Sequence, residues 1–494
     1  MRSAGIVLHV SSLPGPWGIG DLGPAAYAWV DSLTRAQQTW WQVLPLGPAA
    51  EGNSPYQCFS AFAGNPNLIS PDGLIKDGLL RRADCSTEVF AEDHVDYKRV
   101  ERFKSRLFSL AWDRFRTDSS RRLRSSFEEY CQAESEWLDD FALFMALKEA
   151  KGGASWLDWP EELVLRKPFA LKQARRELRD AIGKHQFIQF LFSRQLGMLR
   201  RYAHARGIRL MGDLAMFVSG ESADVWANPE LFQLDKHRRP TAVAGVPPDY
   251  FSKTGQRWGN PLYNWPAMRR QGYAWWIARL RRTLAQVDWV RIDHFRGFEA
   301  YWRIPAHLPT AEHGRWVKAL GAELFQVFRM KLGDLHLIAE DLGAITPEVE
   351  ELRDAFRLPS MRVLQFAFGK DADDRFLPHN YGRNTIVYTG THDNNTTCGW
   401  YVSLSAKGRA DLRRYASYAD GDENWVMLRL AWASVSECAM APLQDVLGLG
   451  AEARMNTPGR PRGNWQWRFV AEQLTPDVVG RLADLTRTYA RHPR

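Results

Sequence analysis

Short apolar runs rich in β-branched and aromatic residues recur along the chain, and each closes on Gly or polar residues. Eight such runs are Gly5–Val10, Trp40–Leu46, Ile208–Val218, Val287–Phe295, Leu335–Leu342, Arg362–Phe368, Thr385–Gly390 and a weaker one at Ala439–Leu447. Apolar residues at successive positions are typical of strands that are buried on both faces.

Segments with helical periodicity lie between most of these runs. Examples are Pro24–Arg35, Tyr273–Gln286, Arg315–Leu332 and Pro347–Phe356. Strands that alternate with helices indicate a parallel sheet. Eight of them predict an α/β fold of the closed (β/α)8, or TIM, barrel type.

Two intervals between the predicted strands exceed ordinary loop length, so we expect both to be insertions in one catalytic barrel domain spanning residues 1–494. Residues 64–184 show amphipathic helical patterns, such as Trp137–Ala150 and Leu171–Ile182. Residues 219–272 are rich in Pro, Gly and Trp and follow a strand, which predicts a lid at the C-terminal face of the barrel. Some 47 residues follow the eighth run, enough for one or two helices but too few for a C-terminal β-sandwich domain.

Composition narrows the class of protein. With 45% hydrophobic and 25% charged residues, the 494-residue chain has the profile of a soluble globular protein. The net charge of +8 comes from basic doublets interspersed with acidic residues, which indicates a solvated mixed surface and no nucleic-acid partner. Five scattered cysteines without a CxxC motif favour a reducing compartment. Because the chain shows neither a signal peptide nor an 18-residue apolar stretch, we expect a cytoplasmic protein without a membrane partner.

Carboxylates stand at the C-terminal ends of several predicted strands. The residues concerned are Asp213 on the third run, Arg291, Asp293 and His294 on the fourth, Glu340 on the fifth, and His392 and Asp393 after the seventh. In a (β/α)8 barrel these strand ends meet at one rim, where catalytic groups lie. Several carboxylates at one mouth would repel one another unless their ionisation is controlled, so a catalytic site is favoured.

The spacing of these residues suggests roles. Arg291 and Asp293 are two apart on a strand and therefore point to the same side, where the guanidinium is expected to lower the pKa of Asp293, as an attacking carboxylate requires. Glu340 follows an apolar run, so desolvation is expected to raise its pKa toward that of a general acid. Such a pair is typical of glycoside chemistry, and a separation of about 5–5.5 Å would give retention of configuration. A purely structural ion pair inside the barrel is the alternative for Arg291 and Asp293.

Other motifs do not support a cofactor. Gly18–Gly23 matches GxGxxG, but it begins eight residues after Val10, and no acidic residue ends the next strand, so a dinucleotide site is not expected. There is no P-loop, GxSxG or HExxH sequence. We therefore expect neither a cofactor nor a catalytic metal.

Several motifs together resemble one known family. They are Gly18–Gly23 (GIGDLG), Ser54–Gln57 (SPYQ), Pro247–Trp265 (PPDYFSKTGQRWGNPLYNW), Arg291–Phe298 (RIDHFRGF), Ala339–Pro347 (AEDLGAITP), Val363–Phe368 (VLQFAF), Tyr388–Asn394 (YTGTHDN) and Gly463–Arg468 (GNWQWR). The chain resembles, from Gly5 to about Arg468, the 4-α-glucanotransferases of the amylomaltase or disproportionating-enzyme type (glycoside hydrolase family 77), which are relatives of the α-amylases.

This resemblance implies that Asp293 is the nucleophile, Glu340 the acid/base and Asp393 the stabiliser of the transition state. It also implies that Pro247–Trp265 forms a mobile lid in which Trp258 stacks on acceptor-side glucose. The substrate-binding residues that it implies are Arg291, His294, His392, Asp213, Tyr56, Trp258, Asp249 and Asn464. Among these, the resemblance implies that Tyr56 contacts glucan away from the reaction centre.

The expected activity is transfer of a 1,4-α-glucan segment to the 4-hydroxyl of an acceptor, with α-glucans and maltooligosaccharides as substrates and glucose as an acceptor. An α-amylase-like hydrolase is the alternative enzyme, and a non-enzymatic glucan-binding scaffold is the alternative of a different class. The 21 Trp fit a glucan cleft only in part. Trp41 and Trp289 lie in strand patterns, whereas Trp226, Trp258, Trp265 and Trp465 are expected in loops near the barrel mouth.

Overall fold

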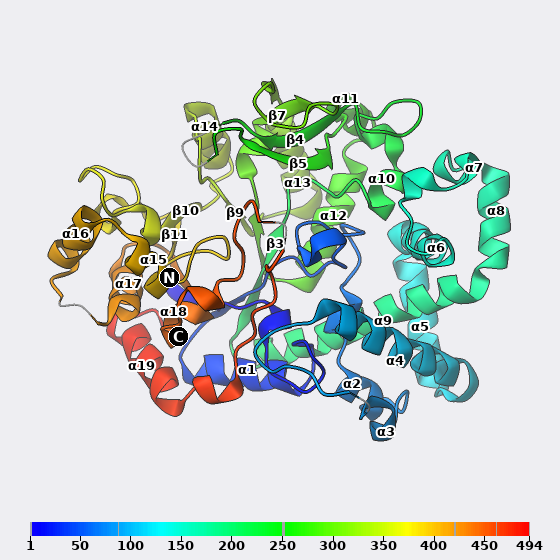
Figure 1. Cartoon of the computed structure of the whole chain (residues 1–494), viewed down its shortest axis with the longest axis horizontal. Coiled ribbons are helices and arrows are strands. Elements are labelled where there is room, and N and C mark those ends of the chain that lie inside the picture. The colour runs from blue at the N-terminus through cyan, green and yellow to red at the C-terminus, as the bar shows by residue number, and fades with distance from the viewer. Residues whose placement is uncertain (1, 87, 249–251, 419–420, 461, 494) are drawn as a thin grey trace.

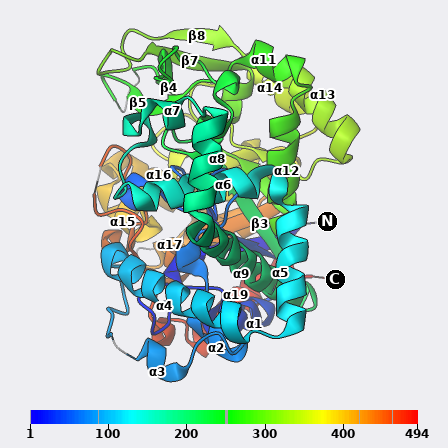
Figure 2. The same ribbon diagram turned by 90° about the vertical axis from the view of Figure 1, so that its right-hand side faces the viewer.

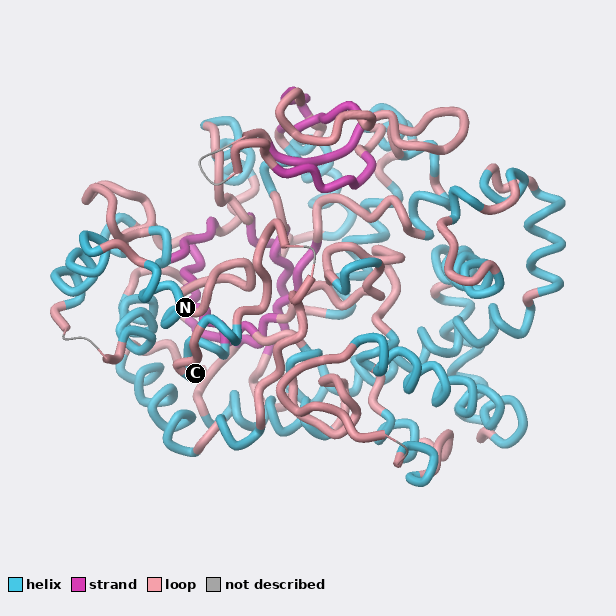
Figure 3. Tube along the Cα trace, viewed as in Figure 1, coloured by secondary structure: helices cyan, strands magenta, loops and turns pink. Residues whose placement is uncertain are grey.

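The computed structural model describes residues 2–86, 88–248, 252–418, 421–460 and 462–493. Its centre is a closed barrel of eight parallel strands surrounded by helices (Figures 1 and 3). The barrel strands are β1 (Ser3–Val7), β2 (Trp40–Gln42), β3 (Arg209–Leu214), β6 (Trp289–Ile292), β9 (Leu337–Ala339), β10 (Ser360–Val363), β11 (Thr385–Tyr388) and β12 (Cys438–Pro442). The predicted (β/α)8 barrel is confirmed, including its eighth strand.

Each strand is shorter than the apolar run that predicted it. Several runs end in a short helix at the C-terminal end of the strand: Phe295 opens a 3-10 turn over Phe295–Phe298, and Leu443–Leu447 forms helix α18. The apolar character continues because these turns are also buried. Periodicity alone does not show where the strand stops.

The barrel interior is a packed core. Side chains that point inward include Val7, Met211, Ile338, Ile386 and Met440, all of which are at most 7% exposed. Such filling is usual for an eight-stranded barrel. The chemistry must therefore lie at the rim.

Helices cover the outside of the barrel strands. These are α1 (Pro24–Arg35), α12 (Ala274–Gln286), α13 (Gly321–Leu332), α14 (Pro347–Ala355), α15 (Thr397–Ser403), α16 (Ala406–Ala416), α17 (Glu423–Ala433), α18 (Leu443–Leu447) and α19 (Pro476–Thr488). Pro at the first position of α1 and α14 sets the helical φ where no backbone donor is needed. Within residues 443–460 and 462–493 the chain forms helices and loops rather than a β-sandwich.

The chain segment that connects β2 to β3 forms a group of helices beside the barrel (Figure 1, right; Figure 2, front). They are α2 (Pro71–Lys76), α3 (Arg82–Cys85), α4 (Tyr97–Asp118), α5 (Arg121–Ala133), α6 (Ser135–Ala150), α7 (Glu161–Val164), α8 (Pro168–Glu177) and α9 (Arg179–His204). Trp112, Phe115, Phe127 and Phe187 form the aromatic centre that joins α4, α5 and α9. The predicted helix Leu171–Ile182 is interrupted at Leu178, where α8 ends and α9 begins.

A second, four-stranded antiparallel sheet lies above the barrel strands in Figure 1. Its strands, in the order β5–β4–β7–β8, are β5 (Gln256–Pro261), β4 (Ala242–Val246), β7 (Ala300–Pro305) and β8 (Arg315–Lys318). The predicted helix Arg315–Leu332 is wrong in its first residues, because Arg315–Lys318 pairs with β7 and the helix begins at Gly321. The short helices α10 (Ala223–Ala227) and α11 (Trp265–Arg270) flank β4 and β5 along the chain.

Among the described residues, the helices are all too short or too polar to cross a lipid bilayer.

Candidate active site

Adjacent barrel strands bring the predicted charged residues together. In the parallel register, Asp213 on β3 is paired with Arg291 on β6, and Ile292 is paired with Ala339 on β9. The residues that follow the second pair are Asp293 and Glu340. Two neighbouring strands therefore end in the two carboxylates at the same level of the rim.

Arg291 links two carboxylates. Its Nη1 lies 2.7 Å from Asp213 Oδ2 and 3.0 Å from Asp293 Oδ1. The side chains of Arg291 and Asp213 are buried, whereas that of Asp293 is 30% exposed. The predicted common orientation of Arg291 and Asp293 is thus what the structure shows. Because the Asp293 carboxylate is partly exposed to solvent, this cluster is not an ion pair enclosed in the barrel interior.

The net effect on Asp293 differs from the sequence prediction. Burial raises its pKa to about 6, and Arg291 opposes this rise without reversing it. Nearby Asp213 and Asp393 raise the pKa further. The expected lowering of the pKa below the ordinary value is therefore wrong, because sequence spacing reveals the neighbouring cation but not the depth of burial.

Glu340 is held by backbone donors. The N–H of His294 donates to Oε2 at 2.8 Å, and the N–H of Leu342 donates to Oε1 at 2.8 Å. Burial raises the pKa of Glu340 to about 7, the charge of Arg291 opposes this rise, and the charge of Asp293 adds to it. The predicted upward shift of the Glu340 pKa is confirmed.

The turn after Asp293 has an uncommon backbone. His294 adopts a left-handed conformation with φ of 51°, which directs its N–H at Glu340. Gly297 leaves space for this turn, since a Cβ at that position would lie 3.0 Å from the imidazole of His294. Burial lowers the pKa of His294 to about 3, so its ring is neutral. Its Nε2 is buried without a hydrogen-bond partner among the described residues, which leaves it available for a ligand.

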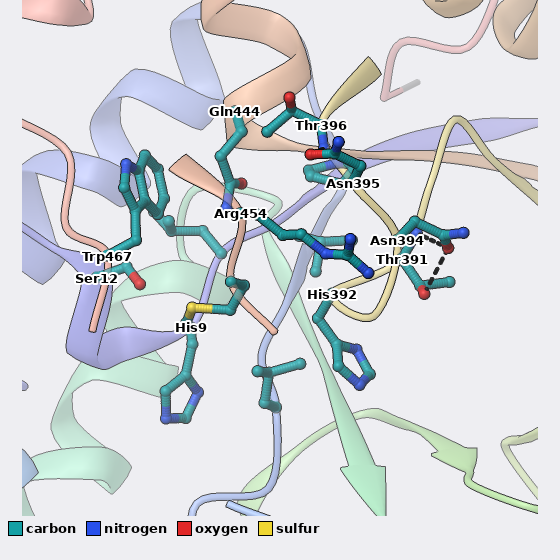
Figure 4. A pocket seen from close by; sticks show the side chains of 15 residues that line it. His9, Ser12, Thr391, His392, Asn394, Asn395, Thr396, Gln444, Arg454 and Trp467 are labelled. Carbon is teal, nitrogen blue, oxygen red and sulfur yellow. Dashed lines mark hydrogen bonds between the residues drawn. The ribbon is translucent and has the colours of Figure 1, made fainter. Parts of the chain in front are cut away.

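His392 and Asp393 follow β11 and face this cluster. His392 Nε2 lies 3.4 Å from Asp393 Oδ2, and the charge of Asp393 reaches Asp293. The side chain of Asp393 is 47% exposed, more than those of the other carboxylates of the site. His392, Thr391 and Asn394 line a cavity of about 30 Å³, and Figure 4 shows their side chains together with the other lining residues.

Tyr56, expected to lie away from the reaction centre, instead reaches the Arg291 cluster from the loop after β2. Its hydroxyl donates to Asp213 Oδ2 at 2.9 Å, and its ring stacks on His392 with 5.1 Å between ring centres. Trp465 lies against both rings, at 6.0 Å from Tyr56 and 5.9 Å from His392. This small aromatic cluster lies next to the Arg291 cluster and provides a flat apolar surface of the kind that binds a sugar ring.

Trp258, on β5, comes from the second sheet. Its ring meets the edge of His294 at 4.8 Å and approaches Phe217 at 6.4 Å. The indole is only partly buried. The edge strand β5 therefore extends an aromatic side chain toward the turn that carries Asp293.

Two predicted binding residues are not placed in the cleft. Asp249 lies outside the described residues. The side-chain amide of Asn464 accepts from the N–H of Thr457 at 2.9 Å and donates to the carbonyl of Arg460 at 2.8 Å. Its amide thus closes a loop, and the neighbouring Trp465 makes the contact with the site.

Two of the tryptophans expected near the mouth belong to the core instead. Trp226 is fully buried in α10 against Phe144 and Trp159, and Trp265 is 4% exposed at the start of α11. Trp258 and Trp465 are the two that contact residues of the candidate site. The excess of Trp is therefore mainly structural.

Known proteins share this sequence and fold. Residues 8–473 match the sequence profile of the family described as 4-alpha-glucanotransferase, glycoside hydrolase family 77. The chain is 49% identical over 499 residues to the 4-alpha-glucanotransferase of Thermus thermophilus, with 99% of each chain covered. It is 48% identical over 495 residues to that of Synechocystis, covering 99% of this chain and 98% of the relative.

Among solved structures, the amylomaltase from Streptococcus agalactiae in complex with acarbose has a TM-score of 0.97 and 38% sequence identity, with 100% of both chains covered. The amylomaltase from Corynebacterium glutamicum shares the fold with a TM-score of 0.80 at 19% identity, covering 98% of this chain and 75% of that one. The resemblance carried by the motifs is confirmed, and the α-amylase-like alternative is not favoured. The chain belongs to the 4-alpha-glucanotransferases of glycoside hydrolase family 77.

Proposed function

We propose that this chain transfers segments of 1,4-α-glucans to the 4-hydroxyl of an acceptor glucose or maltooligosaccharide by a retaining double displacement. The observation that carries the proposal is the pair of carboxyl groups at the ends of β6 and β9. Asp293 contacts Arg291, and Glu340 has a pKa raised to about 7. Family membership and the acarbose complex of the S. agalactiae amylomaltase support an α-glucan site.

In the first step, Asp293 attacks the anomeric carbon and a glycosyl–enzyme ester forms as the glycosidic bond breaks. Glu340 gives its proton to the departing glycosidic oxygen. A pKa of about 7 keeps a large share of Glu340 protonated at neutral pH, when most of Asp293, with its pKa of about 6, is ionised. These pKa values therefore suit Glu340 as the general acid and Asp293 as the nucleophile.

In the second step, Glu340 takes the proton of the incoming 4-hydroxyl, whose oxygen attacks the anomeric carbon and releases Asp293. Asp393 and His392 hold hydroxyls of the ring at the reaction centre, and the half-exposed carboxylate of Asp393 offsets the positive charge that develops there. Tyr56 provides the surface on which that ring stacks, and His294 offers its buried Nε2 to a sugar hydroxyl.

Transfer requires that an acceptor sugar compete successfully with water. Residues 219–272 are proposed as the lid, with Trp258 as its sugar-stacking residue. Its contact with His294 and Phe217 supports this, because a sugar stacked there would cover the turn beside Asp293. A cytoplasmic location remains a prediction, with which five free cysteines agree.

Incubation with pure maltotriose tests the proposal. Glucose together with a ladder of products longer than maltotriose is the expected result. Shortened products alone would assign the chain to the hydrolases. If maltotriose and longer maltooligosaccharides all stayed unchanged, both enzymes would be rejected.

The nucleophile is tested separately with Asp293→Asn, for which we expect turnover to fall by about 10³-fold or more while glucan binding persists. Asp484→Asn, at a 75% exposed side chain on α19, is the matched control and is expected to leave turnover unchanged. Normal turnover in Asp293→Asn would disprove the assignment.

A further inference from the structure

A short segment after β12 supports the loop that carries His392 and Asp393. Asn456 Nδ2 donates to Asp393 Oδ1 at 2.6 Å, and its backbone N–H donates to the carbonyl of His392 at 3.2 Å. Arg454 Nη2 donates to the carbonyl of Asp393 at 2.6 Å. Neighbouring residues of one segment therefore bind both the backbone and the carboxylate of this loop.

Further hydrogen bonds hold residues 454–456 in place. Arg454 Nε donates to the carbonyl of Asn456 at 2.7 Å, and the N–H of Trp465 donates to the carbonyl of Met455 at 2.8 Å. Trp465 in turn lies against Tyr56 and His392. Figure 4 shows the Arg454 side chain extended along the cavity toward the loop of Thr391, His392 and Asn394.

The Asp393 carboxylate is thereby held between two partners. Asn456 contacts Oδ1, and His392 Nε2 lies 3.4 Å from Oδ2. With a side chain that is 47% exposed, Asp393 would otherwise turn about its χ2 bond, because a surface carboxylate has a broad torsional preference. The amide donor selects one orientation without neutralising the charge.

We propose that Asn456 is a positioning residue for Asp393, which it aligns with the reacting sugar while Arg454 fixes the backbone beneath it. This inference rests on the proposed function, in which Asp393 stabilises the transition state. A carboxylate turned away from the ring would still be present but would stabilise less of the developing charge. The expected loss therefore appears in kcat more than in KM.

The sharpest variant is Asn456→Asp, which keeps the shape of the side chain and replaces the donor by an acceptor. Two carboxylates would then meet where the structure has a 2.6 Å hydrogen bond, and they would share a proton with a raised pKa. The other charged or titratable groups around Asp393 are His392, Arg454, Asp293 and Tyr56. All four are unchanged in the variant, so a new pH dependence is assigned to the introduced carboxyl group.

With maltotriose as the donor and acceptor, we expect kcat of Asn456→Asp at pH 7.5 to fall on the order of 10- to 100-fold, with a change in KM below about threefold. The ratio of variant kcat to wild-type kcat should rise as pH is lowered, because a proton restores a hydrogen bond between the two carboxyl groups. Asn384→Asp is the matched control. Its amide donates only to the backbone carbonyls of Arg357 and Leu358 at the opposite end of β11, so its kcat ratio should stay near one at every pH.

Circular dichroism and the melting temperature report the folding of each variant. Asn456→Ala provides a second measurement if Asn456→Asp is unstable. It should lose kcat to a similar extent, with a ratio that does not change with pH. Wild-type kinetics in both folded Asn456 variants would overturn the inference, and so would a loss in Asn456→Asp that is independent of pH. An absence of transfer in the wild-type protein would instead reject the proposed function.

Discussion

At the residue scale, burial has a larger effect on the catalytic carboxyl groups than their charged neighbours. Arg291 contacts Asp293 directly, yet the pKa of Asp293 is raised to about 6. Two residues on one face of a strand can be inferred from sequence. The desolvation of those residues depends on loops that arrive from elsewhere in the chain, such as the one carrying Tyr56, and cannot be inferred from spacing.

The two raised pKa values predict the pH dependence of the free enzyme. Activity needs Asp293 ionised and Glu340 protonated, so kcat/KM for maltotriose should rise through about pH 6 as Asp293 loses its proton and fall above about pH 7 as Glu340 loses its own. Initial rates from pH 4.5 to 9 at low substrate concentration measure this profile.

The variant Glu340→Gln tests whether Glu340 causes the fall in kcat/KM above about pH 7. Glu340→Gln should retain activity on an aryl maltoside whose leaving group needs no proton, with no fall in the glycosylation rate between pH 7 and 8.5. A fall that persists in this variant would mean that another group titrates there.

At the scale of elements, the barrel could be predicted and the second sheet could not. Barrel strands such as β11 are apolar on both faces, so their sequences stand out. In contrast, β5 (QRWGNP) and β8 (RWVK) are the polar edge strands of a small sheet. The hairpins β4–β5 and β7–β8 lie in separate segments of the chain and join through β4 and β7. The three hydrogen bonds that Arg454 and Asn456 donate to His392 and Asp393 likewise join segments about 60 residues apart, which no local pattern reveals.

The position of Trp258 on the edge strand β5 predicts a change in reaction outcome. Trp258→Ala should remove about 1 kcal/mol of acceptor stacking, which would lower the ratio of transfer to hydrolysis by about fivefold. Reducing-end release and the oligosaccharide ladder, measured together on maltotriose, give this ratio.

Trp316→Ala is the matched control for this prediction. Trp316 lies on β8 of the same sheet, is 37% exposed and packs against Trp302 and Arg296. It therefore contacts the turn after Asp293 through Arg296, whereas Trp258 contacts it through His294. We expect its ratio of transfer to hydrolysis to match that of the wild type. An equal decrease in both variants would indicate a general weakening of the sheet instead of a lost sugar contact.

At the scale of the whole molecule, the two ends of the chain meet. β1 pairs with β12, and the labels N and C lie close together in Figure 1. Arg491 is fully buried and donates to the carbonyls of Ser3, Trp432 and Ser434 at 2.7–2.9 Å. One guanidinium thus joins the first strand of the barrel to the helix before its last strand.

Arg491→Ala should therefore lower the stability of the barrel. The carbonyls of Ser3 and Ser434 would lose this donor, while that of Trp432 would keep the one from Arg2. An unsatisfied buried group costs about 1–3 kcal/mol. We expect an earlier unfolding midpoint in urea, followed by far-ultraviolet circular dichroism, with little change in kcat of the folded enzyme. Arg487→Ala, at a 56% exposed side chain on α19, is the control and should leave the midpoint within error of the wild type. A shift of equal size in both variants would contradict a special contribution of Arg491.

The β1–β12 pairing also has a consequence for biosynthesis. During translation, Ser3–Val7 can find β2 early, but its other edge has no partner until Cys438–Pro442 has left the ribosome. For most of the synthesis, the nascent chain therefore carries an open, apolar strand edge, the kind of surface that chaperones cover and that leads to aggregation when left bare. Strand β12, which begins almost nine-tenths of the way along the chain, closes that edge.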